Sequence, residues 1–288
     1  MIRKNILVTG ASSGLGYAAT RTLAANGFYV FAAAREICGV FNSIENIEEV
    51  VLDITNEQSI KECFSYIETI NKDYPLWGLV NNAGICVPSP LELLESFDLR
   101  RQLDTNVIGQ LLVTQSAIPF IRKSQGRIVN ITSGLGSIAV PYLGAYSIAQ
   151  FAKMGFSDAL RRELKHSGAT VSVVQPGAIY TPIWDKFLTT GKEILNQSTD
   201  EKRKIYERSF TEFLKSSQAA AYSAKATEDD FAQVILEVLT TKMPATHYYV
   251  GDDAKYFAEK SRKSTTFEID QWFDLQSPTE SEFKKIVY

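Results

Sequence analysis

The sequence is poor in the residues that build metal centres and disulfide frameworks. Its 288 residues include three cysteines and two histidines, and none of them forms a CxxC or HxxxH pair. Cysteines so few and so scattered indicate buried or half-buried thiols in a reducing compartment. We therefore expect no metal site.

Two further features are missing, an excess of basic charge and a long apolar run. The formal net charge is -3 and the sequence pI is about 5.6, so no overall field attracts nucleic acid. No stretch reaches the roughly 18 apolar residues that a membrane span needs, and the short apolar run near the N-terminus ends at a glycine turn. The sequence predicts a cytoplasmic protein with no nucleic-acid partner and no membrane span.

Short apolar runs alternate along the chain with longer helical patterns. The runs are almost continuously apolar, as in strands that are buried on both faces of a parallel sheet. This alternation predicts an α/β fold, a Rossmann-type doubly wound parallel sheet of seven strands with helices on both faces. The expected strands are 6–8, 28–32, 50–52, 78–80, 127–131, 171–174 and 246–250, and the expected helices are 15–26, 56–72, 96–121, 145–166 and 228–241.

The chain shows no internal repeat and no linker, so 1–288 is predicted to form a single domain. The segment 182–226 is polar but carries aromatic residues at roughly helical spacing, which is typical of a surface excursion or of a substrate lid. Its place after the sixth strand favours the lid, because ligands bind at the carboxyl ends of strands in such sheets. The segment 260–288 is a charged, weakly patterned tail.

A glycine-rich turn joins the first strand to the first helix. It contains Gly10, Gly14 and Gly16 at Gly-x3-Gly-x-Gly spacing. Glycines permit a tight turn, and they let backbone N–H groups approach a pyrophosphate at a helix N-terminus. The strand–turn–helix context makes this a candidate dinucleotide site.

This spacing resembles the short-chain dehydrogenase/reductase family, and further family motifs follow in the same order. They are Asn81-Asn82-Ala83-Gly84 after the fourth strand, Asn106 in a helix, Ser133 after the fifth strand, Tyr146 13 positions later, and Pro176-Gly177 with Thr181 after the sixth strand. The resemblance covers about residues 4–251 and is to hydroxysteroid and retinol dehydrogenase-like members. It implies an oxidoreductase that interconverts a carbonyl and a secondary alcohol with a nicotinamide dinucleotide.

The resemblance also implies which residues hold the cofactor. They come from the glycine turn, from the ends of later strands and from the helix that carries Tyr146. The expected set is Gly10, Ser12, Ser13, Gly14, Leu15, Gly16, Arg35, Asp53, Ile54, Asn82, Ala83, Gly84, Tyr146, Gln150, Pro176, Gly177, Ile179 and Thr181.

The end of the second strand predicts NADP(H) rather than NAD(H). Ala34 stands where an acidic residue would hydrogen-bond the ribose 2′-OH of NAD, and Arg35 offers a permanent charge to a 2′-phosphate. The acidic residue next to Arg35, Glu36, is a weak argument against this preference. Asp53 resembles the family's adenine-contacting aspartate, and it could also cap the helix that starts near Asn56.

The predicted catalytic group departs from the family at one position. In the family a tyrosine exchanges a proton with the substrate, a serine hydrogen-bonds the substrate oxygen, and an asparagine supports a water chain to a lysine four residues after the tyrosine. Tyr146, Ser133 and Asn106 match, but Gln150 stands at the lysine position. Glutamine is uncharged, so it cannot stabilise a tyrosinate as an ammonium does.

Three explanations of Gln150 are open: a natural variant with slow or altered catalysis, a cofactor-binding relative that acts as a binding or sensing protein, or a deliberately inactivating change. Lys153 lies seven residues after Tyr146 on the same helix face, but we expect it to be a surface lysine. A second Tyr-x3-Lys pair, Tyr256 with Lys260, follows the last strand and is rejected.

The expected substrate is a hydrophobic alcohol or ketone, similar to a steroid, a retinoid or a lipid. The apolar segment 140–143, Tyr142 and Tyr180 are expected to be pocket walls. The family is commonly dimeric or tetrameric, so a homodimer or homotetramer is expected. Phe151, Met154 and Phe156 would serve an interface or the core equally well.

Overall fold

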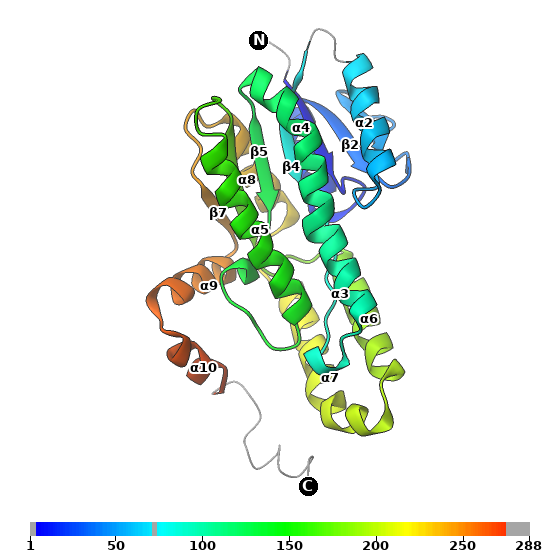
Figure 1. Ribbon diagram of the computed structural model, residues 1–288, viewed down its shortest axis with the longest axis vertical. Helices are drawn as coiled ribbons and strands as arrows, with labels where there is room; N and C mark the ends of the chain where they lie inside the picture. The colour runs from blue at the N-terminus through cyan, green and yellow to red at the C-terminus, as the bar shows by residue number, and fades with distance from the viewer. Residues whose placement is uncertain (1–3, 71–73, 275–288) are drawn as a thin grey trace.

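The chain, in a computed structural model that describes residues 4–70 and 74–274, is built around a sheet of seven parallel strands. The strand order is β3-β2-β1-β4-β5-β6-β7 (Figure 1). The chain adds strands on one side of β1 as far as β3, then crosses to the other side and adds β4 to β7. The predicted seven-stranded parallel α/β fold is therefore confirmed. The strands are β1 (Asn5–Thr9), β2 (Tyr29–Ala34), β3 (Ile47–Val51), β4 (Leu76–Asn81), β5 (Arg127–Ile131), β6 (Thr170–Pro176) and β7 (His247–Val250).

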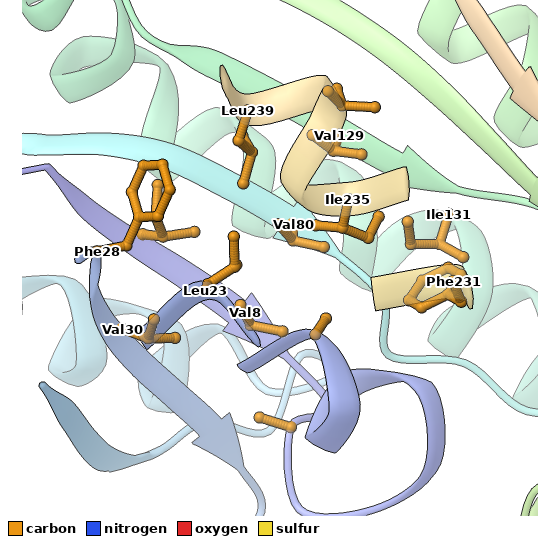
Figure 2. Close-up of a cluster of buried hydrophobic side chains, with 14 of the residues drawn as sticks. Val8, Leu23, Phe28, Val30, Val80, Val129, Ile131, Phe231, Ile235 and Leu239 are labelled. Atoms are coloured by element: carbon orange, nitrogen blue, oxygen red, sulfur yellow. The ribbon is translucent and has the colours of Figure 1, made fainter. Parts of the chain in front are cut away.

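Both faces of the sheet are covered by helices, which explains why the strands are apolar at successive positions. On one face, Val8 and its neighbours pack against Leu23 of α1 (Gly14–Ala25) and against Phe231 and Ile235 of α8 (Glu228–Thr240), as Figure 2 shows. On the other face, Leu7 belongs to a second core. That core is covered by α2 (Glu57–Ile70), α4 (Gln110–Ser124) and α5 (Gly144–Glu163).

The helix predicted at 96–121 is divided into three parts. It consists of α3 (Ser96–Leu103), a π-helical turn η2 (Asp104–Gly109) and α4. The helix predicted at 56–72 is α2 as far as Ile70, and the prediction for 71–72 falls outside the described residues. Two short 3-10 turns, η1 (Leu91–Leu93) and η3 (Gly134–Gly136), follow β4 and β5. Single π-turns inside helices are frequent at functional sites.

The segment predicted as a lid forms two long helices, α6 (Ile183–Gln197) and α7 (Asp200–Tyr222). They project beyond the carboxyl ends of the strands, at the foot of Figure 1. Phe187 of α6 and Phe210 and Leu214 of α7 belong to a third core, separate from the two cores on the faces of the sheet. This core also includes Val87, Leu93 and Leu143, so the pair packs on the segments after β4 and before α5.

The chain continues after β7 into α9 (Asp252–Lys263) and α10 (Thr266–Asp274). Most of the described part of the predicted tail is therefore helical, and 275–288 lies outside the described residues. No helix in the described parts of the chain combines the length and the apolar composition needed to cross a membrane.

Candidate active site

A single large cavity lies at the carboxyl ends of the strands and extends beneath α6 and α7. Its volume is about 1830 Å³. Pockets for one drug-sized ligand measure roughly 300–1,000 Å³, so this cavity has room for a dinucleotide and a second molecule together. Every predicted site residue lines it except Gly16.

The glycine turn forms the floor of the cavity beside β1. Gly10 and Gly14 have positive φ angles of +66° and +55°, which side chains rarely adopt, and a Cβ on Gly10 would come within 2.9 Å of the Ala83 backbone. Gly16 lies behind the turn: a Cβ there would lie 2.2 Å from the Gly10 carbonyl oxygen. The absence of a side chain at Gly16 thus lets α1 approach the turn, and the predicted contact of Gly16 with the cofactor stays a prediction.

The N-terminus of α1 offers its backbone N–H groups to an anion. Ser13 is the N-cap residue, its side chain makes no capping hydrogen bond, and the first turn holds no acidic residue. Thr9 and Asn82 fix this turn to the end of β4. The Thr9 hydroxyl accepts from the N–H groups of Asn82 and Ala83, each at 3.0 Å, and the Asn82 amide donates to the Thr9 carbonyl at 2.9 Å. Such a rigid, donor-lined floor fits a pyrophosphate.

The end of β2 places Arg35 at the rim of the same cavity. Arg35 is exposed, and Ala34 before it brings no acidic group. The loop that follows is held by Glu49 of β3, whose carboxylate accepts from the backbone N–H groups of Cys38, Gly39 and Phe41. This fixed edge holds one guanidinium at the rim of the cavity.

Asp53 lies at the cavity but does not cap α2. Its Oδ1 accepts from the backbone N–H and the hydroxyl of Thr55, at 2.9 and 2.7 Å. The cap is Asn56, whose side-chain oxygen accepts from the N–H groups of Gln58 and Ser59. The capping alternative for Asp53 is therefore wrong. Its carboxylate is used in a local Asx turn, and the cap is Asn56, three residues later.

Asn106 and Gln102 brace the loop that follows β4. The Asn106 side chain accepts from the Ile85 N–H and donates to the Ile85 carbonyl, both at 2.9 Å. The Gln102 side chain accepts from the Val87 N–H at 2.8 Å and donates to the same Ile85 carbonyl. Sequence reasoning missed Gln102. The available signal was a glutamine four residues before Asn106, a spacing that puts both side chains on one helix face.

Ser133 is the N-cap of η3 and faces the cavity. Its hydroxyl oxygen accepts from the Leu135 N–H at 3.2 Å, while its carbonyl accepts from the Gln175 amide at 3.0 Å. The hydroxyl has one hydrogen to donate, which reaches the Tyr146 oxygen here and could serve a substrate oxygen at the same place. The serine is thus held as a donor.

Tyr146 faces Ser133 from the first turn of α5. Burial raises the pKa of the Tyr146 phenol, the neighbouring Cys86 raises it further, and a hydrogen bond with the Ser133 side chain lowers it. The phenol therefore keeps its proton throughout the neutral range. Ser133 and Tyr146 together present two hydroxyls to one point in the cavity.

Gln150 and Lys153 follow Tyr146 on the inner face of α5. The Gln150 side chain is 1% exposed, and its Oε1 has no hydrogen-bond partner among the described residues. A buried acceptor with no partner fits a ligand hydroxyl. Lys153 is 3% exposed and donates from Nζ to the Ile131 carbonyl, so the prediction of a surface lysine is wrong. The face shared with Tyr146 points at β5 and not at solvent.

The outer part of the cavity is apolar and aromatic. Tyr142, a wall as predicted, has a positive φ of 64° and donates its hydroxyl to Ser209 of α7 at 3.0 Å. Strained residues of this kind cluster at functional sites. Tyr180 is not a wall, because its ring stacks on Tyr222 at the surface, with ring centroids 4.1 Å apart. Further walls are Val140, Trp184, Phe187 and Phe213.

The C-terminal helices contribute walls that sequence reasoning missed. Phe257 of α9 and Trp272 and Phe273 of α10 line the cavity, and Tyr256 of the rejected Tyr-x3-Lys pair does not. Asp253 accepts from the Ala178 N–H at 2.7 Å and so ties α9 to the turn after β6. The Trp272-Phe273 pair in an otherwise polar tail was the available signal.

Comparisons with known proteins agree with this geometry. The family model for short chain dehydrogenase matches residues 4–191. The 3-amino-tetrahydro-pyrrolizinone reductase of Xenorhabdus hominickii is 77% identical over 99% of this chain and all of that protein. Human 17-beta-hydroxysteroid dehydrogenase type 6 is 35% identical over 88% of this chain and 82% of that protein.

A solved structure shares the fold at low identity. A short chain dehydrogenase from Burkholderia cenocepacia in complex with NADP has a TM-score of 0.73 and 21% identity, over 96% of this chain and 99% of that one. The family model covers well over half of the chain, and both relatives exceed 30% identity over most of their length. The chain therefore belongs to the short-chain dehydrogenase family of oxidoreductases.

Proposed function

We propose that the chain is an NADP(H)-dependent reductase whose substrate is a small bicyclic ketone of the amino-tetrahydropyrrolizinone class. The observation that carries the proposal is the 77% identity, over nearly the whole chain, to a reductase named for such a compound. The identity spans α6, α7 and the C-terminal helices that enclose the outer cavity. Retinol and hydroxysteroid dehydrogenases, at 31–35% identity, support the steroid or retinoid class predicted from the sequence less strongly.

Two hydroxyls would act on the substrate carbonyl. Ser133 donates a hydrogen bond that polarises and positions the oxygen, and Tyr146 donates the proton that completes an alcohol. NADPH, when bound, supplies the hydride to the carbonyl carbon. The enclosed apolar walls exclude water, which strengthens both hydrogen bonds.

The environment of Tyr146 keeps its phenol in the acid form. Reduction uses the tyrosine as an acid, and a raised phenol pKa keeps the proton in place until the substrate oxygen takes it. Gln150 brings no charge to stabilise the tyrosinate. Replacing the expected lysine with glutamine therefore costs reduction and oxidation alike, because both directions pass through the same transition state.

Residues on the floor of the cavity would hold the cofactor. The N–H groups at the start of α1 fit the pyrophosphate, the Arg35 guanidinium fits a 2′-phosphate, and the Gln150 side-chain amide would hydrogen-bond a ribose hydroxyl. Asp53 and Ile54, which also line the cavity, would contact the adenine. These contacts support a preference for NADP(H) over NAD(H).

The proposal is tested with purified protein, NADPH and three carbonyl compounds: an amino-tetrahydropyrrolizinone, retinal and a 17-ketosteroid. We expect NADPH consumption and a reduced product with the first compound, and at least ~10-fold lower kcat/KM with the other two. NADPH consumption confined to retinal or the steroid would contradict the substrate class. No consumption with any carbonyl, despite tight NADPH binding, would contradict the enzyme assignment.

That last outcome would support a second candidate, a non-catalytic NADP(H)-binding or sensing protein. The observation that favours it is Gln150, which removes the charge expected beside Tyr146. The intact floor of the cavity would then serve binding alone.

We also propose that the protein is an oligomer and that it is cytoplasmic. Ile108, Leu111, Ile148 and Phe151 are exposed on η2, α4 and α5, and Phe151 is 47% exposed. Met154 and Phe156 are half-buried against the sheet and fit the core alternative. We infer a homodimer or homotetramer through this apolar face, and light scattering showing a monomer would contradict it.

A further inference from the structure

Lys153 is a buried amine that the proposed reaction leaves without a role. It lies on the inner face of α5, lines the cavity and donates to the carbonyl of Ile131, the last residue of β5. A lysine has three N–H donors, so this bond leaves two for other acceptors. Burying an ammonium is costly, and a methionine of similar length would fill the same space without that cost.

Gln150 supplies the complementary feature. Its Oε1 is buried and without a partner, it lies three residues before Lys153, and both side chains line the same cavity. Residues at i and i+3 are neighbours on a helix surface, with Cβ atoms about 5–6 Å apart. The lysine side chain points back toward the helix N-terminus, which is the direction of Gln150 and Tyr146. An acceptor that lacks a donor thus lies beside an amine with donors to spare.

We infer that Lys153 is a positioning residue that acts through Gln150, and that the two side chains together occupy the place of one catalytic lysine. With the cofactor bound, Lys153 would donate to Gln150 Oε1 and so turn the Gln150 amide N–H groups toward the ribose. The same ammonium, on the helix face of Tyr146, would favour the phenolate that forms as the proton leaves for the substrate. The inference rests on the proposed function and names a further residue for it.

Charged groups lie on several of the elements around Lys153. Burial alone lowers the pKa of the Lys153 ammonium to about 7. Besides β5, whose charged residue is Arg127, four elements pack against α5 here. The charged groups they carry are Asp98, Arg100 and Arg101 on α3 and Asp104 on η2, whereas β6 and η3 carry none. The other titratable groups nearby are Tyr146 on α5 itself and Cys86 after β4.

The test moves the lysine along the helix. Lys153→Met, Gln150→Lys and the double variant are compared with the native chain and with Lys165→Met, an exposed control at the end of α5. For Lys153→Met we expect kcat to fall by ~10-fold or more, NADPH affinity to weaken about threefold or more, and the pH dependence of kcat near pH 7 to disappear. The double variant should recover kcat to within about threefold of the native value, while Gln150→Lys alone gains little because two ammonium groups then share one site.

Each result decides between the inference and a structural role. Native kcat, NADPH affinity and pH profile in Lys153→Met would overturn the inference, as would a double variant no more active than Lys153→Met. Melting curves check folding, and Lys153→Gln replaces the methionine variant if that variant does not fold. If the native chain reduces no carbonyl, the proposed function fails on its own, and unchanged NADPH affinity in Lys153→Met then overturns the inference separately.

Discussion

The two halves of the cavity are built differently. The cofactor half combines the glycine turn and the backbone N–H groups at the start of α1, fixed by hydrogen bonds of the Thr9 and Asn82 side chains, with the polar side chains of Arg35 and Asp53 at its rim. The substrate half consists of side chains from segments far apart in the sequence, among them Tyr142, Phe213 and Trp272. Backbone geometry tolerates little variation, whereas a side-chain wall can change while the fold stays intact. The comparison teaches that binding and turnover in this protein can be altered separately.

The largest expected effect is the loss of kcat when the Tyr146 hydroxyl is removed. Tyr146→Phe should lower kcat by ~10²–10⁴, because the acid that completes the alcohol is gone. NADPH affinity should change by less than about threefold, since the floor of the cavity is untouched. Steady-state rates and calorimetric titration measure the two quantities, with Tyr256→Phe, outside the cavity, as the matched control. A parallel loss of affinity would show that the halves are not separable.

Arg35→Ala should affect the cofactor half alone. Loss of a charge-assisted contact to the 2′-phosphate should weaken NADP(H) binding by ~1.5–3 kcal/mol, about 10-fold to 150-fold, and leave NAD(H) binding nearly unchanged. Calorimetry with both cofactors checks this, and Arg122→Ala on the exposed end of α4 is the control. Equal weakening of both cofactors, or native binding that favours NAD(H), would refute the predicted preference.

The helices α6 and α7 should respond to ligand more than the sheet does. We expect trypsin to cut first within 182–226, and NADPH with substrate to slow that cleavage by about threefold to tenfold as the pair closes over the cavity. Mass spectrometry of the fragments identifies the sites. Cleavage at the same rate with and without ligands would show that the pair is a fixed wall rather than a lid.

The smallest expected effect is on thermal stability, which the buried ammonium of Lys153 lowers. The pKa of this group is about 7 in the fold against 10.5 when exposed. The unfolded chain therefore binds more protons between these values, and native stability rises with pH across that window. Lys153→Met lacks this cost, so it should melt ~3–8 °C above the native chain at pH 6, with the gap closing toward pH 10. A constant gap across this range, with Lys165→Met as reference, would contradict the buried charge.

The fold was largely predictable, because periodicity reports local backbone needs, and the glycine spacing located the turn that lines the cavity. Continuous apolar strands at 6–8 and 127–131 specified a parallel sheet, and the Ser133–Tyr146 spacing placed both hydroxyls at one edge. Helix periodicity correctly put Lys153 on the face of Tyr146, but it did not show that β5 covers that face. Trp272 and Phe273 could not be placed either, since nothing local fixes where a C-terminal helix returns to the sheet.

The most direct test of the central claim follows the hydride itself. The protein is incubated with an amino-tetrahydropyrrolizinone and NADPH that carries deuterium at the transferable position, and the product is analysed by mass spectrometry. The account predicts an alcohol with one deuterium on the former carbonyl carbon, formed in equal amount to the NADPH consumed, and formed at least ~100-fold more slowly by Tyr146→Phe. An unlabelled product, or no product from protein saturated with NADPH, would contradict it.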